Sequence, residues 1–314
     1  MQSFSIVIPC YNEEQSLTGL FEAVSETVSG IKDRYAVTCI FVDDGSKDGT
    51  LTAIKALRSD FIKIEYISFS RNFGKESAML AGIRKSKGDL VAILDSDLQH
   101  PPHYLLDMLR EMEGGECDMV AMRRVSRKGD PVVKSWMARW FYRFVNRISE
   151  TDIADGVGDY RLMKRIVADA VLQLPEYHRF SKGLFAWVGF RTKYLEYENV
   201  ERVAGESKWS FFKLLRYAID GIVSFSAFPL RIASIIGGAV SCVALVYLIC
   251  VLVEYFTVGI DVPGYPTMIC AVLLAGGLIL LALGIIGEYL ARTYEQVKHR
   301  PLYLVREETP GEKE

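Results

Sequence analysis

The sequence predicts an α/β protein in which a mostly parallel sheet, covered by helices, is followed by two transmembrane helices. Two observations predict this fold class. Short runs rich in β-branched and aromatic residues alternate with helical patterns in the first part of the chain, and two long uncharged runs follow later. The chain has 314 residues, of which 50% are hydrophobic, so it has enough material for a substantial core.

Five short apolar runs are the candidate strands, and helical patterns lie between them. The strands are expected at Phe4–Pro9, Val37–Asp43, Ile62–Phe69, Leu90–Leu94 and Met119–Met122. The helices are expected at Glu14–Val28, Leu51–Leu57, Glu76–Lys85 and Tyr104–Met112. Repetition of strand, helix and strand implies a parallel sheet covered on both faces, with ligands at the carboxyl ends of the strands.

Two uncharged runs, Ile232–Val253 and Thr267–Gly287, each have about the length that a helix needs to cross a bilayer. The loop between them contains no Lys or Arg, whereas basic residues precede the first run and follow the second. By the positive-inside rule, both long flanks are therefore cytoplasmic. A buried helical hairpin in a soluble protein is the alternative, and two runs with this charge bias argue against it.

Two further segments, at about 133–149 and 208–228, have the pattern of amphipathic helices. In the first, Trp136 and Trp140 recur at helical spacing, and arginines such as Arg143 gather to one side. Aromatic side chains sink into the headgroup region and arginines meet anionic lipid, so we expect interfacial helices. A core-facing amphipathic helix is the alternative for each.

Acidic motifs follow the first two predicted strands. Pro9-Cys10-Tyr11-Asn12-Glu13-Glu14 follows the first, and Asp43-Asp44-Gly45-Ser46 follows the second. Neither is the GxGxxG of a dinucleotide fold or the GxxxxGK[ST] of a P-loop, so both of those classes lose their main support. An acidic strand end suits accepting hydrogen bonds from a base or a ribose, although Asp44-Gly45 is also a turn former.

A third acidic motif, Asp95-Ser96-Asp97-Leu98-Gln99-His100-Pro101-Pro102, follows the fourth predicted strand. Asp95 and Asp97 can both face a divalent cation, and Gln99 adds a third oxygen. Such oxygen ligands suit Mg²⁺ or Mn²⁺, which in this kind of site shares its coordination with a diphosphate. A capping aspartate is the alternative for either carboxylate.

Together, the three motifs closely resemble glycosyltransferase family 2, whose GT-A (Rossmann-like) fold carries the same three blocks. Within that family, Arg71-Asn72-Phe73-Gly74-Lys75-Glu76 and Gly158-Asp159-Tyr160-Arg161-Leu162-Met163 look like those of the polyprenyl-phosphate glycosyltransferases. These are relatives of dolichyl-phosphate mannose synthase and of the bactoprenol glucosyltransferases. The resemblance covers nearly the whole chain, including the two uncharged runs.

The resemblance implies a role for each matched position. Asp97 and Asp159 are the expected catalytic residues, and the metal ligands are Asp95, Asp97 and Gln99. The expected nucleotide-sugar contacts are Pro9, Tyr11, Asn12, Glu13, Asp43, Asp44, Lys75, Asp95 and Ser96.

The negative charge of a lipid phosphate requires cations, and Arg binds phosphate in a bidentate manner. The residues expected to bind the acceptor phosphate or the donor diphosphate are Arg123, Arg127, Arg202 and Lys208. Because a phosphate monoester has a second pKa near 6, the acceptor is already mostly a dianion at neutral pH. Asp159 can therefore orient the sugar or the acceptor rather than remove a proton.

These inferences predict an inverting transfer of glucose from UDP-glucose to undecaprenyl phosphate on the cytoplasmic face of the inner (plasma) membrane. Mannose, N-acetylglucosamine or an aminoarabinose derivative remain open as the sugar. A processive polysaccharide synthase would carry a Gln-x-x-Arg-Trp motif and more membrane spans, and the sequence has neither. A non-catalytic membrane adaptor is disfavoured by the complete carboxylate set.

The predicted organisation has a cytoplasmic catalytic domain at 1–228, a two-helix transmembrane hairpin at 229–290 and a cytoplasmic tail at 291–314. A net charge of -2 gives no footprint of a nucleic-acid binder. A homo-oligomer, for example a tetramer, stays open, since Pro301–Val305 could form a strand that pairs with another subunit.

Overall fold

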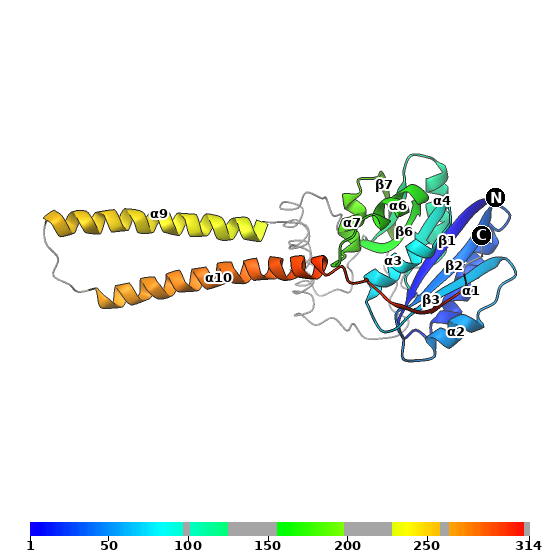
Figure 1. Ribbon diagram of the computed structural model, residues 1–314. Coiled ribbons are helices and arrows are strands. Elements are labelled where there is room, and N and C mark those ends of the chain that lie inside the picture. Colours follow the sequence, from blue (N-terminus) through cyan, green and yellow to red (C-terminus); the bar gives the residue numbers. More distant parts are fainter. Residues whose placement is uncertain (97–100, 125–155, 198–227, 258–263, 311–314) are drawn as a thin grey trace. The chain divides into compact units, whose positions relative to one another are not determined.

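The computed structural model describes residues 1–96, 101–124, 156–197, 228–257 and 264–310 (Figure 1). The chain divides into two compact units, which are described separately. One unit comprises Met1–Ala218 together with Pro301–Glu314, and the other comprises Ile219–Arg300.

The first unit is built on a mixed sheet that, among the described residues, has eight strands in the order β7-β5-β6-β4-β1-β2-β3-β8. The strands are β1 (Gln2–Cys10), β2 (Tyr35–Asp43), β3 (Ile62–Phe69), β4 (Leu90–Ile93), β5 (Met119–Arg124), β6 (Val157–Lys164), β7 (Thr192–Tyr197) and β8 (Val305–Glu308). The pairs β1–β2, β1–β4, β2–β3 and β5–β7 are parallel, whereas β6 and β8 pair antiparallel with their neighbours. The predicted mostly parallel α/β sheet is confirmed.

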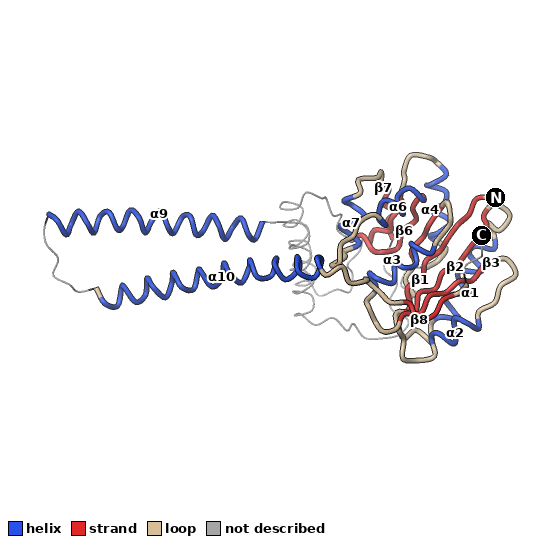
Figure 2. The backbone as a smooth tube through the Cα atoms, in the orientation of Figure 1, coloured by secondary structure: helices blue, strands red, loops and turns tan. Residues whose placement is uncertain are grey.

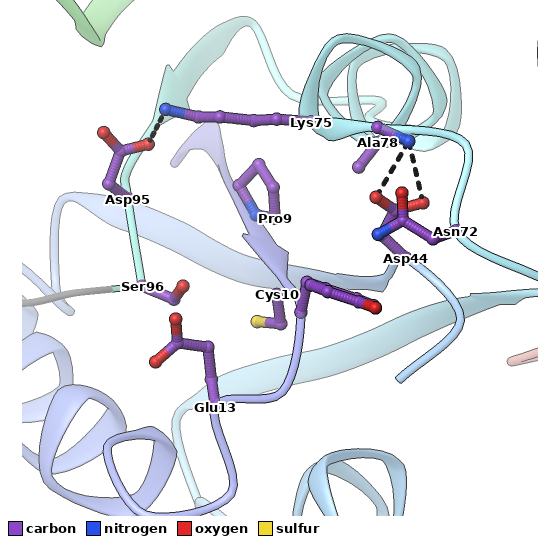
Figure 3. A pocket seen from close by; sticks show the side chains of 11 residues that line it. Pro9, Cys10, Glu13, Asp44, Asn72, Lys75, Ala78, Asp95 and Ser96 are labelled. Carbon is purple, nitrogen blue, oxygen red and sulfur yellow. Dashed lines mark hydrogen bonds and ion pairs between the residues drawn. The ribbon is translucent and has the colours of Figure 1, made fainter. Parts of the chain in front are cut away.

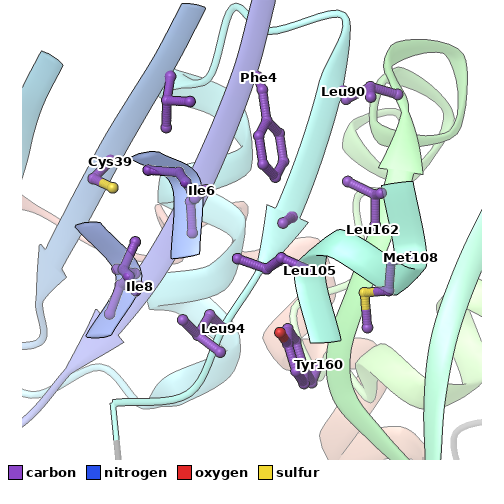
Figure 4. Close-up of a cluster of buried hydrophobic side chains, with 14 of the residues drawn as sticks. Phe4, Ile6, Ile8, Cys39, Leu90, Leu94, Leu105, Met108, Tyr160 and Leu162 are labelled. Carbon is purple, nitrogen blue, oxygen red and sulfur yellow. The ribbon is translucent and has the colours of Figure 1, made fainter. Parts of the chain in front are cut away.

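Helices cover both faces of this sheet. They are α1 (Leu17–Ser29), α2 (Thr50–Ala56), α3 (Lys75–Lys85), α4 (Tyr104–Glu113), α6 (Arg165–Leu172) and α7 (Ser181–Trp187). Since successive side chains of a strand point to opposite faces, Ile6 and Ile8 of β1 pack with α1 and α4, while Val7 packs with α3. Figure 4 shows Ile6 and Ile8 in the first of these clusters, near Leu105 and Met108 of α4.

The C-terminal strand β8 pairs antiparallel with β3 of the same chain, with Ile67 opposite Glu308 (Figure 2). Sequence reasoning placed a strand slightly earlier, at 301–305, and suggested that it pairs with another subunit. In the structure, β8 covers the β3 edge of its own sheet, and the homo-oligomer stays a prediction. Covering an edge in this way satisfies backbone groups that would otherwise be open to pairing with another chain.

The second unit contains two long apolar helices, α9 (Phe228–Thr257) and α10 (Tyr265–Val297). Phe228–Tyr247 and Leu274–Val297 are long and apolar enough to cross a membrane, and these windows are 0% buried inside the protein. Both predicted runs lie within these helices. The predicted interfacial helices at about 133–149 and 208–228 fall outside the described residues, apart from Phe228, and the domain boundaries stay a prediction.

The close packing of α3 on β1 generates a prediction about stability. A Cβ added at Gly82 would lie 2.1 Å from Cγ1 of Val7, so Gly82→Ala should lower the free energy of unfolding by about 1–3 kcal/mol. At Gly19 in α1 an added Cβ meets nothing within 4 Å, so Gly19→Ala should raise stability by about 0.5–1 kcal/mol. Thermal melting of the detergent-purified chain measures both. A Gly82→Ala protein that melts like wild type would contradict this packing.

Candidate active site

A cavity of about 370 Å³ lies where the carboxyl ends of β1, β2 and β4 meet the start of α3 (Figure 3). Parallel strands present their carboxyl ends at one edge of a sheet, and the loops that follow them form the usual ligand site of such folds. The cavity is lined by Pro9, Cys10, Tyr11, Glu13, Asp44, Asn72, Gly74, Lys75, Ala78, Asp95 and Ser96.

Most of the residues predicted to contact a nucleotide sugar line this cavity. They are Pro9, Tyr11, Glu13, Asp44, Lys75, Asp95 and Ser96. Sequence reasoning missed Cys10, Asn72, Gly74 and Ala78. Asn72 and Gly74 belong to the motif at 71–76, so their nearness to Lys75 in the sequence was a usable signal.

Asn12 and Asp43, also predicted as donor contacts, hold the turn after β2 instead of lining the cavity. Asn12 has a φ of 56°, its amide N–H donates to Ser46 Oγ at 3.0 Å, and its Oδ1 accepts from the Lys47 N–H at 2.9 Å. The buried carboxylate of Asp43 accepts from the Ser46 N–H at 2.9 Å and from Ser68 Oγ at 2.7 Å. Both side chains therefore shape the loops around the cavity.

Asp44 connects the end of β2 to the loop before α3. Its Oδ1 accepts from the Phe73 N–H at 2.7 Å, and its Oδ2 accepts from the Gly74 N–H at 2.9 Å. Burial raises the pKa of Asp44 to about 6, although these two backbone hydrogen bonds act in the opposite direction. At Gly45, which has a φ of +66°, an added Cβ would lie 2.3 Å from the backbone carbonyl carbon of Arg71. The two loops thus approach closely, and glycine permits it.

Lys75 joins two carboxylates from different strands. Its Nζ lies 2.6 Å from Asp95 Oδ1, just after β4, and 2.6 Å from Asp159 Oδ2, in β6. Figure 3 shows the Lys75 side chain reaching to Asp95. Asp159 is not among the residues that line the cavity, and it is linked to Asp95 through this shared ammonium group.

Lys75, Asp95 and Asp159 are here called the triad, and their mutual attraction shifts the pKa values of Lys75 and Asp159. Burial disfavours the charged form of Lys75, but the attraction of Asp95 and Asp159 outweighs it and raises the Lys75 pKa above its usual range. Burial acts to raise the pKa of Asp159, but the attraction of Lys75, Lys182 and Arg161 together outweighs it, so that the net pKa falls to about 2. Asp159 is therefore a carboxylate at neutral pH and a weak base.

Two charged residues to which the sequence assigned no role, the half-buried Glu76 and the buried Arg161, support the arrangement of Lys75, Asp95 and Asp159. Glu76 accepts hydrogen bonds from the backbone N–H of Ser181, at 3.1 Å, and from the Ser181 hydroxyl, so it ties α3 to α7. Arg161 is fully buried, donates to the carbonyl oxygens of Gly158 at 2.8 Å and of Asp159 at 3.2 Å, and lies 3.8 Å from the Phe185 ring centroid. Burial is the main cause that lowers the Arg161 pKa and raises the Glu76 pKa.

The predicted metal and phosphate ligands are only partly within the described residues. Asp97, Gln99, Arg127, Arg202 and Lys208 fall outside them, and Arg123 is exposed near the end of β5. The described residues contain no group of three His, Cys, Asp or Glu that could hold a metal. Asp95 places a carboxylate oxygen at the cavity, which is the donor chemistry that Mg²⁺ and Mn²⁺ prefer, so this residue fits such an ion.

The α/β sheet has its cavity at the carboxyl ends of parallel strands, as in other α/β proteins that bind ligands there. Comparison with known proteins identifies the family. Residues 5–172 match the family model described as Glycosyl transferase family 2. The chain belongs to glycosyltransferase family 2, and the α/β fold described above is its GT-A fold.

The relatives are similar over nearly their whole length. The putative glycosyltransferase CsbB of Bacillus subtilis (strain 168) is 46% identical over 96% of this chain and 91% of that protein. The uncharacterized glycosyltransferase sll0501 of Synechocystis sp. is 44% identical over 96% of this chain and 94% of that protein. The bactoprenol glucosyl transferase of Shigella phage SfV is 40% identical over 97% of this chain and 98% of that protein.

A more distant likeness is to a crystal structure of glucosyl-3-phosphoglycerate synthase from Mycobacterium tuberculosis with Mn²⁺, UDP-glucose and phosphoglyceric acid. It is 19% identical, covers 71% of this chain and 78% of that chain, and has a TM-score of 0.45. At that distance it does not bear on the site.

The triad predicts a pH-dependent loss of stability. Lys75→Met leaves two partly buried carboxylates without their ammonium partner, which should cost about 1–3 kcal/mol near neutral pH, a value reduced because Lys75 is 45% exposed. The depressed pKa of Asp159 contributes stability above its unfolded value of about 3.9, and that contribution is lost as pH falls toward about 2.

The difference in unfolding free energy between wild type and Lys75→Met should therefore shrink as pH falls below about 4. Denaturant titrations at several pH values measure it. Lys193→Met, which removes an exposed ion pair with Glu111, is the matched control and should show no such trend. A Lys75→Met deficit that stays constant down to about pH 2 would contradict the coupling of Lys75 to these carboxylates.

Proposed function

We propose that this chain transfers glucose from UDP-glucose to a polyprenyl phosphate, with inversion, at the cytoplasmic face of the membrane. The products are a polyprenyl-phosphate-linked sugar and a nucleoside diphosphate. The observation that carries the proposal is the cavity lined by Tyr11, Asp44, Lys75 and Asp95, in a chain similar over nearly its full length to bactoprenol glucosyl transferases.

The lining of the cavity supports binding of the donor. Tyr11 is 40% exposed and offers an aromatic face on which a base can stack. Glu13 and Asp44 offer carboxylate oxygens to base or ribose groups that donate hydrogen bonds. Lys75 lines the cavity and is placed to meet the diphosphate, which would draw it away from Asp95.

A divalent cation, Mg²⁺ or Mn²⁺, is part of the proposal. Asp95, Asp97 and Gln99 would hold it. When bound, it would stabilise the negative charge that builds on the departing nucleoside diphosphate.

The ionisation of Asp159 supports a phosphate acceptor over a hydroxyl acceptor. A sugar hydroxyl needs a general base, and a carboxylate held by Lys75 with a depressed pKa is poorly suited to that task. A phosphate dianion is already a nucleophile at neutral pH. We assign Asp159 to orienting the transferred sugar or the acceptor, and Arg123, Arg127, Arg202 and Lys208 to the phosphate charges.

The apolar helices support a lipid acceptor. α9 and α10 are long enough to span a bilayer, which would place the chain in the inner membrane as a two-span protein with its catalytic domain cytoplasmic. A polyprenyl phosphate has its charged end at the membrane surface, where such a domain can reach it. Interfacial helices at about 133–149 and 208–228 would support this placement.

The test is direct transfer. Detergent-purified protein is incubated with undecaprenyl phosphate, Mg²⁺ or Mn²⁺, and radiolabelled UDP-glucose, GDP-mannose, UDP-N-acetylglucosamine or a UDP-aminoarabinose, and label is counted in the organic phase. We expect metal-dependent lipid labelling from UDP-glucose. Asp97→Ala should reduce it by at least about 100-fold, because it would remove a ligand of the cation that stabilises the transition-state charge, and loss of such stabilisation typically costs that much.

Labelling from another sugar alone would overturn the choice of glucose. If no donor labels the lipid while the protein still binds a nucleotide, the polyprenyl phosphate acceptor is wrong.

A further inference from the structure

The segment Leu302–Thr309, here called the C-terminal strap, lies against the loop Ser70–Gly74, here called the donor loop. The donor loop joins β3 to α3 and contributes Asn72 and Gly74 to the cavity. The strap contains β8 and follows α10 in the sequence. It lines no part of the cavity, so any effect that it has on the site must act through the donor loop or α3, both of which it contacts.

Hydrogen bonds from one backbone N–H and one side-chain hydroxyl attach the strap to both sides of the donor loop. The N–H of Ser70, the first loop residue, donates to the Leu304 carbonyl oxygen at 2.9 Å. The hydroxyl of Ser77, in the first turn of α3, lies 3.2 Å from the carbonyl oxygens of both Leu302 and Phe73, either of which can accept its one proton. The strap therefore bridges the strand that enters the loop and the helix that leaves it.

A stack of aromatic rings connects the strap to the loop itself. Tyr303 stacks on Phe69, with ring centroids 4.8 Å apart and an interplanar angle of 16°. Phe69 then meets Phe73 of the donor loop edge to face, at 5.8 Å and 89°. The Phe73 N–H is one of the two that donate to Asp44. The order of contacts runs from the strap to the donor loop and on to a side chain that lines the cavity.

The ion pairs of the strap hold it in place less firmly than the ring stack does. Glu307 pairs with Lys55 and Glu308 with Lys85, each at 2.7 Å, but both glutamates are substantially exposed. Exposed ion pairs of this kind contribute little to stability. The half-buried Tyr303 stacks on the buried Phe69 ring, and its hydroxyl accepts a hydrogen bond from Arg84 at 3.2 Å, so it is the strap side chain that connects most directly to the ring stack of the donor loop.

We propose that the C-terminal strap is a positioning element for donor binding, and that Tyr303 is its key positioning residue. The strap holds the donor loop in the arrangement that places Asn72, Gly74 and Lys75 around the cavity. This inference rests on the proposed use of the cavity for a nucleotide sugar. Without the strap, the loop keeps its link to Asp44 but loses support at both ends. Binding of the donor would then have to order the loop, and the free energy this costs would weaken donor affinity.

The test compares Tyr303→Ala, Tyr303→Phe and Arg306→Ala in the full-length protein in detergent. Hydrogen exchange is followed at the amides of Phe73 and Gly74, and KM for the donor and kcat are measured with undecaprenyl phosphate. Tyr303→Ala should speed exchange at these amides and raise the donor KM by about three- to tenfold, the size expected for loss of an aromatic pair, with a smaller change in kcat.

Tyr303→Phe keeps the ring stack and should behave like wild type. Arg306→Ala alters an exposed strap residue outside the ring stack and is the matched control. Unchanged exchange at Phe73 and Gly74 in Tyr303→Ala overturns the proposal, and so does faster exchange with an unchanged donor KM. Equal defects in the Phe and Ala variants would assign the effect to the hydrogen bond with Arg84 and would also contradict it.

Two controls distinguish failure of this proposal from misfolding of the variant and from a wrong assignment of the acceptor. Exchange at the amides of β1 and β2 reports whether Tyr303→Ala is folded. If it is not, the milder Tyr303→Leu removes the ring stack while keeping an apolar side chain, and it should give the same faster exchange. The exchange readout needs no substrate. If the polyprenyl phosphate assignment fails, loop exchange and the affinity for UDP alone still decide whether the strap positions the donor loop.

Discussion

The ammonium group of Lys75 is the one charge that the described part of the site depends on, because it satisfies two carboxylates at once. Asp95 follows β4 at the cavity, and Asp159 lies in the neighbouring antiparallel strand β6. Without the lysine, the two carboxylates, each with a side chain only 16% exposed, would repel one another with little water to screen them. Glu76, the next residue along α3, extends the same junction to α7 through Ser181. The start of α3 therefore joins the cavity at the strand ends to the strand that carries Asp159.

Much of the fold could be predicted because the apolar patterns were strong. β1 to β5 are apolar runs bounded by polar motifs, and α9 and α10 are long uncharged runs, so their periodicity and length were decisive. β6 and β7 could not be recognised this way, and the strand suggested at 301–305 was placed earlier than β8. β6 buries Arg161, and β8 has the sequence Val-Arg-Glu-Glu, in which charged residues dominate. Pairing with a sheet that is already formed, rather than local pattern, makes these segments strands.

The candidate site could be predicted as far as position along the strands determines it. Tyr11, Asp44 and Asp95 each follow a strand whose carboxyl end faces the same edge, so their convergence follows from topology. Sequence could not show that Asp43 and Asn12 hold a turn. Each is adjacent to a polar residue that lines the cavity, and only the direction of the side chain, which the sequence does not reveal, separates the two roles. Sequence also could not show the contacts between Lys75 and Asp159 or between Glu76 and Ser181, which join residues far apart in the chain.

The most direct test of the central claim is to locate the bound nucleotide. UDP-glucose carrying a photoreactive azide on its uracil ring would be cross-linked to the detergent-purified protein, and labelled peptides identified by mass spectrometry. We predict label on peptides that contain Tyr11, Asp44 or Asn72, and its loss when unmodified UDP-glucose is added in excess. Competed label confined to peptides away from these strand ends would contradict the assignment of the cavity as the donor site.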